Sequence, residues 1–83
     1  MNKQDITKLG VKIASKELGM EETDIEVVFK PKQFFQHPDI NAMFIPEVYR
    51  IIFDETWIDQ AQELEILKCA FHETKHAYQR ACR

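Results

Sequence analysis

The sequence predicts a single small α+β domain, residues 1–83, with a helix at each end and short strands between them. Near the N-terminus and again in the last third, apolar residues recur every three or four positions, which is the period of an amphipathic helix. In the middle of the chain, short runs rich in Val, Ile and Phe are separated by prolines and polar turns, which is typical of strands. A chain of 83 residues has room for one modest hydrophobic core.

The first helix is expected from about Asp5 to Leu18. Either Asn2 or Asp5 can cap its start by accepting a hydrogen bond from a backbone N–H group. Gly19 stands where a helix-ending glycine belongs, because such a residue often takes the left-handed conformation. The apolar side of this helix carries Ile6, Leu9, Ile13 and Leu18.

About three short strands are expected next. The first covers residues 24–29, and the other two cover residues 42–45 and 48–53. The last two runs are separated by Pro46 and Glu47, a layout that is typical of a β-hairpin. We therefore expect a small antiparallel sheet. The residues of the first strand that share one face are Ile25, Val27 and Phe29.

From about Thr56 to the end, the apolar spacing predicts one helix, and Thr56 followed by Asp59 resembles a capping box. At about 100° per residue, His72 and His76 share the polar face and Glu73 lies at its side. The opposite side is expected to face the sheet, with the polar face in a groove beside the 48–53 strand. The residues on that opposite side are Ile66, Leu67, Ala70, Phe71, Ala77, Tyr78 and Ala81.

Composition and charge exclude several classes of partner. The net charge is −3, and the 11 Lys and Arg residues are scattered, so neither nucleic acid nor an anionic membrane is expected as the partner. No stretch approaches the roughly 20 apolar residues of a membrane span. On the expected helix, Cys69 and Cys82 would lie about 20 Å apart, too far for a disulfide. Free thiols point to a reducing compartment, and we expect a cytoplasmic protein.

The last helix carries His72-Glu73-Thr74-Lys75-His76, which reads H-E-x-x-H. Two imidazoles four positions apart on a helix can bind one ion, and a catalytic zinc takes about three protein ligands and an open position. We therefore expect His72 and His76 to bind zinc. Glu73, beside them, is expected to be the general base that takes a proton from the water attacking a peptide carbonyl. The alternative is a surface helix with two solvated histidines.

Three segments carry a resemblance to a known family: NAMFIP (41–46), YRIIFD (49–54) and LKCAFHETKHA (67–77). Together they resemble the minimal zincin core of the ImmA/IrrE-type metallopeptidases, which pair a short hairpin with a helix that carries H-E-x-x-H. The resemblance covers about half of the chain. It implies a zinc protease with His72 and His76 as ligands and Glu73 as general base. It also implies a bacterial or mobile-element setting and a protein substrate such as a repressor.

The chain departs from that pattern in two ways. Lys75 occupies a position that is usually uncharged, and we expect it to point away from the ion. In gluzincin-like families the third ligand lies well downstream, whereas this chain has seven residues after His76. We therefore expect either the N-terminal part of a longer protein or an incomplete site. Cys82 and His37 are weaker candidates: Gln79 replaces the glycine that would turn the chain before Cys82, and histidines in turns are more often solvated.

Three functions remain open from the sequence. The first is a zinc-dependent peptidase that acts on a peptide or protein substrate. The second is a non-catalytic, zincin-like module that binds a peptide or a regulator along its sheet edge. The third is a purely structural metal site. An open coordination position and a dependence on Glu73 would distinguish the first function from the third.

Overall fold

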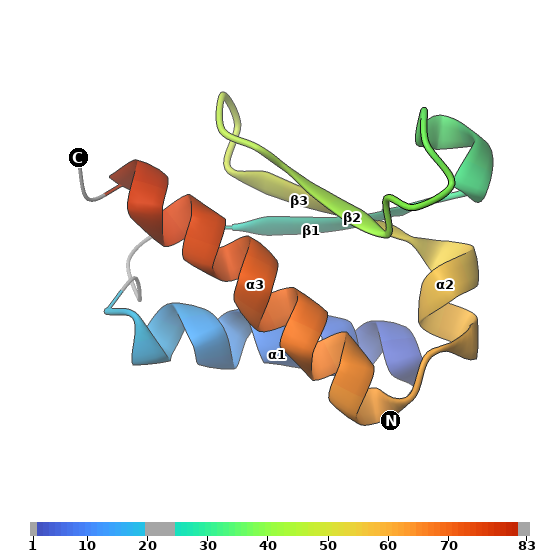
Figure 1. Ribbon diagram of the computed structural model, residues 1–83. Helices are drawn as coiled ribbons and strands as arrows, with labels where there is room; N and C mark the ends of the chain where they lie inside the picture. Colours follow the sequence, from blue (N-terminus) through green and yellow to red (C-terminus); the bar gives the residue numbers. More distant parts are fainter. Residues whose placement is uncertain (1, 20–24, 82–83) are drawn as a thin grey trace.

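The computed structural model describes residues 2–19 and 25–81. It confirms the predicted α+β class, with helices at both ends and three strands between them. Helices α1 and α3 lie side by side on one side of the sheet (Figure 1). The elements in chain order are α1 (Lys3–Glu17), β1 (Glu26–Lys30), the 3₁₀ turn η1 (Lys32–Phe34), β2 (Ala42–Ile45), β3 (Arg50–Asp54), α2 (Glu55–Gln60) and α3 (Glu63–Ala81).

Helix α1 begins and ends as its sequence predicts. The side-chain Oδ1 of Asn2 accepts a hydrogen bond from the backbone N–H of Asp5 at 2.8 Å, so Asn2 is the N-cap. After the helix, Gly19 takes a φ of +74°, a conformation that an L-residue with a side chain rarely adopts.

The three strands form a mixed sheet in the order β1-β3-β2. Strand β2 pairs antiparallel with β3, as the expected hairpin requires, whereas β1 pairs parallel with β3. The expectation of a wholly antiparallel sheet was therefore wrong for the β1–β3 pair. The connection from β1 to β2 passes the end of β3, where the backbone N–H of Asp54 donates to the carbonyl of Asn41 at 2.8 Å. This crossing places β2 on the far side of β3.

One face of the sheet packs against the helices and forms the core. Ile51 and Phe53 of β3 are completely buried there, and Phe29 lies against Phe53 with ring centroids 6.1 Å apart. Alternation along the strands turns Val27 of β1 and Phe44 of β2 to the same side. The helices contribute the remaining buried members of this cluster, which are Val11, Ile58, Ala61, Ile66 and Ala70.

The C-terminal third forms two helices rather than the single helix expected. The chain leaves α2 at Ala61, which is extended (φ −75°, ψ 154°), and then enters α3. Both Ile58 and Ala61 are buried, so this break lets α2 pack into the core before α3 turns back beneath the sheet. Neither glycine nor proline marks the break, and periodicity alone does not locate it.

The cap of α2 also differs from the expected Thr56–Asp59 box. Asp54, the last residue of β3, accepts hydrogen bonds at Oδ1 from the backbone N–H groups of Thr56 (2.9 Å) and Trp57 (3.4 Å). Asp54 is completely buried, and its Oδ2 lies 3.1 Å from the ammonium of Lys32 as an ion pair without hydrogen-bond geometry. A strand residue therefore starts the following helix directly.

The side of α3 that is buried differs from the predicted side by a rotation about the helix axis. Phe71 is 40% exposed, so its expected contact with the sheet was wrong, and Tyr78 and Leu67 are half-buried. Thr74, in contrast, is completely buried and donates its hydroxyl hydrogen bond to the carbonyl of Ala70 at 2.7 Å. The rotation arises because α3 shares its buried side between α1 and the sheet. Among the strands it packs mainly against β2, whereas the polar face was expected in a groove beside the 48–53 strand.

Within the described ranges, no helix combines the length and the apolar character needed to cross a membrane.

Candidate metal centre

Helix α3 brings together His72, Glu73 and His76. The two Nε2 atoms of the histidines are 3.1 Å apart, and the ring planes are almost perpendicular at 89°. One potential ligand atom from each of the three residues lies within 4.8 Å of the other two. A single helical turn thus forms the whole group, because positions four apart lie one above the other.

The spacing of the two imidazole nitrogens fits a zinc ion. Zinc–nitrogen bonds of about 2.0–2.1 Å at tetrahedral angles place two ligand nitrogens about 3.3 Å apart. The 3.1 Å between the Nε2 atoms of His72 and His76 is close to that value. The same spacing also suits a hydrogen bond between one protonated and one unprotonated nitrogen. The two Nε2 atoms therefore lie close together at exposed positions, at a distance that fits either arrangement.

Glu73 differs from the histidines in its surroundings. It is half-buried, whereas both imidazoles are exposed. Burial raises the pKa of the Glu73 carboxyl group above its ordinary value, and the charges of His76 and His72 act in the opposite direction. The carboxylate is therefore partly shielded from water while it stands next to two metal-ligand candidates, which is a suitable environment for a general base.

The packing of α3 holds this turn in place. Gly10 of α1 has no side chain where α3 approaches: a Cβ there would lie 3.0 Å from Leu67 Cδ2 and 3.1 Å from Ala70 Cβ. On the same helix, Thr74 lies between the two histidines in sequence and Ala77 follows His76. Both are completely buried. The turn that carries His72 and His76 therefore has its opposite side buried, and α1 is in close contact just before it, at Leu67 and Ala70.

Cys69 stands one turn before Glu73 and packs against the core as a half-buried free thiol. Burial, with a smaller contribution from the charge of Glu73, raises the pKa of this thiol to about 11. The thiolate is the form that binds zinc, so the surroundings of Cys69 disfavour ligation. It is a packing residue, as an apolar environment predicts.

The weaker ligand candidates do not join the group. His37 is exposed in the loop after η1, and that loop (green) lies at the opposite end of the sheet from the C-terminal half of α3 (Figure 1). Cys82 lies outside the described residues. Lys75 is exposed, and so is Glu65. Among the described residues, Glu73 is the one further group close to the histidine pair that could contact a metal, so they include no third ligand distinct from the expected general base.

The sequence predicts a sheet edge that could bind a peptide, but not which strand forms the edge beside the site. Strand β2 is an edge strand, paired on one side with β3, and it is also the strand that α3 packs against. The hairpin predicted two adjacent strands but not which of them is at the edge. That depends on where β1 pairs, and β1 joins the sheet on the other side of β3.

No family model matches the chain, and no curated protein or solved structure is significantly similar to it. The resemblance of residues 41–77 to a zincin core therefore stays a sequence-based expectation. The site consists of two exposed imidazoles 3.1 Å apart, one half-buried carboxylate and, nearby, an edge of β2 that is unpaired among residues 2–19 and 25–81.

Proposed function

We propose that His72 and His76 bind zinc and that the protein hydrolyses peptide bonds with Glu73 as general base. The observation that supports this most strongly is the convergence of two exposed imidazoles, with Nε2 atoms 3.1 Å apart. This distance is close to the separation of two nitrogens bound to one zinc ion, so both imidazoles can reach the same ion from one helical turn. A half-buried carboxylate on the adjacent residue is the other component that metal-assisted hydrolysis needs.

Each residue of the group has a separate role in this proposal. A bound zinc ion would supply the Lewis acidity that makes water nucleophilic near neutral pH. His72 and His76 hold the metal from the exposed face of α3. Glu73, with a carboxylate oxygen within 4.8 Å of both histidine ligand atoms, accepts the proton that the attacking water loses. It then returns that proton to the nitrogen of the leaving amine, so that the peptide bond breaks without net proton uptake.

The edge of β2 supplies a place for the peptide. An extended peptide can pair with an unpaired edge strand through main-chain hydrogen bonds, which depend little on its side chains. Because β2 is the strand nearest α3, a peptide paired with β2 would pass close to the histidine face. The proposal places the protein in the cytoplasm, where a free thiol such as Cys69 stays reduced.

A turnover experiment separates hydrolysis from metal binding alone. Glu73→Gln keeps the size of the side chain and removes the base, so it should lower peptide hydrolysis at least about a hundredfold while zinc stays bound. Lys75→Gln, at an exposed position of the same turn, is the matched control and should keep wild-type turnover. Cleavage of a mixed peptide library, with zinc content measured in parallel, reads out both properties.

Equal turnover for the wild type and Glu73→Gln would contradict the catalytic proposal. Zinc retention without any cleavage would support the second function, a module that binds peptides through β2 without cutting them.

A further inference from the structure

The face of the sheet opposite the helices is only partly covered: Val28, Met43 and Ile45 are half-buried there, and Ile52 of the central strand is 2% exposed. Parallel strands are typically buried on both faces, and β1 and β3 form a parallel pair. Helices α1 and α3 cover one face (Figure 1), and within the described ranges no helix covers the other. That outer face is nevertheless apolar. Along the strands it presents Val28, Met43, Ile45 and Ile52, which alternate with the core residues.

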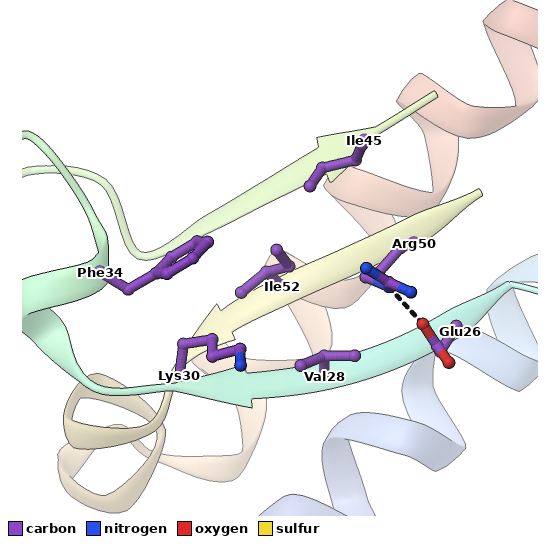
Figure 2. Close-up of a pocket in the computed structure, with 7 residues that line it drawn as sticks. All are labelled: Glu26, Val28, Lys30, Phe34, Ile45, Arg50 and Ile52. Atoms are coloured by element: carbon purple, nitrogen blue, oxygen red, sulfur yellow. Dashed lines mark hydrogen bonds and ion pairs between the residues drawn. The ribbon is translucent and has the colours of Figure 1, made fainter. Parts of the chain in front are cut away.

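Figure 2 shows a hollow on this outer face. Its volume is about 460 Å³, and its floor is formed by Val28, Ile45 and Ile52. Phe34 of η1 closes one end with a ring that is 45% exposed. The remaining residues that line the hollow are charged side chains at its ends: Glu26, Lys30 and Arg50.

The charges around the hollow leave one positive charge uncompensated. The guanidinium of Arg50 forms an ion pair with the carboxylate of Glu26 (Figure 2), so these two charges neutralise each other. Lys30 makes no ion pair with any described residue, and its ammonium lies 6.0 Å from the centroid of the Phe34 ring. The chain as a whole carries a net charge of −3, so this local positive charge differs in sign from the rest of the molecule.

The dimensions of the face suit one helix. Five-residue strands are about 17 Å long, and the two outer strands of three lie about 10 Å apart. One α-helix about 10 Å wide, with about 11 residues in contact, matches that length and width. A second copy of the chain suits it less, because a stable dimer buries about 800 Å² per partner. The sheet face covers on the order of 250 Å², an area that supports a weak, transient contact with one helix but not a stable dimer.

We propose that the outer sheet face, the surface formed by the half-buried Val28 and Ile45 and the exposed Lys30 and Phe34, binds an amphipathic helix of a partner protein. The helix has about three turns, with an apolar stripe along the floor and an acidic residue that meets the ammonium of Lys30. This interaction is independent of the metal centre, which lies on the polar face of α3 below the sheet.

Two synthetic peptides test this inference. Each has about 18 residues, long enough to be helical, with the same leucine stripe. One carries Glu on its polar face and the other carries Lys. We expect the acidic peptide to bind at least about tenfold more tightly in fluorescence anisotropy. The protein has a net charge of −3, which by itself would favour the basic peptide. A preference for the acidic peptide would therefore have to come from the local positive charge of Lys30.

Variants locate the binding site. Lys30→Glu reverses the charge of the outer face and should reverse the peptide preference, with or without zinc. Lys12→Glu makes the same change at an exposed position of α1 and should keep the wild-type preference. Circular dichroism of each variant confirms that it is folded.

Four results would overturn the inference. The first is equal binding of the two peptides, and the second is the same effect from Lys30→Glu and Lys12→Glu. In the third, binding is lost on Leu9→Gln, a change on the exposed side of α1, but not on Lys30→Glu, which would place the peptide on the helices instead. Sedimentation equilibrium should find monomers, and a dimer that Lys30→Glu dissociates would identify a second copy as the occupant.

Discussion

At the scale of single residues, the sequence predicts the exposed side of α3 more accurately than its buried side. The wheel places His72 and His76 on the polar face and Glu73 at its edge, and the structure has the histidines exposed and Glu73 half-buried. It fails for Phe71, which the wheel places on the buried side and which is 40% exposed. Thr74 also lies on the buried side of the wheel, about 200° from His72, and it is completely buried although its side chain is polar. Thr74 is buried because its hydroxyl group finds a carbonyl on its own helix, an option that a hydrophobicity pattern does not include.

The raised pKa of Cys69 predicts that its thiol reacts slowly with alkylating reagents. With a pKa of about 11, roughly one Cys69 in a thousand is ionised at pH 8. In a Cys82→Ser background, iodoacetamide should therefore alkylate the folded protein at least about tenfold more slowly than the urea-unfolded protein. The rate for the folded protein should keep rising with pH up to about 11, because only the thiolate reacts. Mass spectrometry follows the reaction, and equal folded and unfolded rates would contradict the burial of Cys69.

At the scale of elements, the close approach of α1 and α3 determines where the histidine turn lies. Small residues allow it, above all Gly10 opposite Leu67 and Ala70. The sequence predicts both helices and the hairpin, since each depends on local periodicity and turn chemistry. It does not predict that α2 and α3 are separate, because the break at Ala61 depends on which residues reach the core.

Gly10→Val tests this helix contact. The valine side chain would meet Leu67 and Ala70 at distances that real Cβ atoms seldom show, so α3 would have to shift. We expect the free energy of unfolding to fall by about 2 kcal/mol or more. Lys12→Val, an exposed position of the same helix, should cost less than about 1 kcal/mol, the helix-propensity difference alone. Urea unfolding measures both, and equal losses would mean that α1 and α3 are not in close contact at Gly10.

At the scale of the whole molecule, the fold class and the order of elements are predictable, whereas the neighbours in the sheet are not. Alternating apolar residues identify each strand, but the pairing of β1 with β3 depends on a connection that crosses the end of β3. That pairing makes β2 an edge strand beside α3 and leaves the outer sheet face apolar. Both proposed binding surfaces, the edge of β2 and the outer face, therefore result from a single choice of strand order.

The central claim is that the two exposed histidines of α3 form one metal site, and calorimetric titration with zinc tests it most directly. The wild-type protein should bind one zinc ion per chain. His72→Ala and His76→Ala should each weaken that binding at least about tenfold, because a single imidazole holds zinc poorly. Lys75→Ala, exposed on the same turn, should leave the affinity unchanged. If His76→Ala bound zinc as tightly as the wild type, or the wild type bound none, the account of the site would be contradicted.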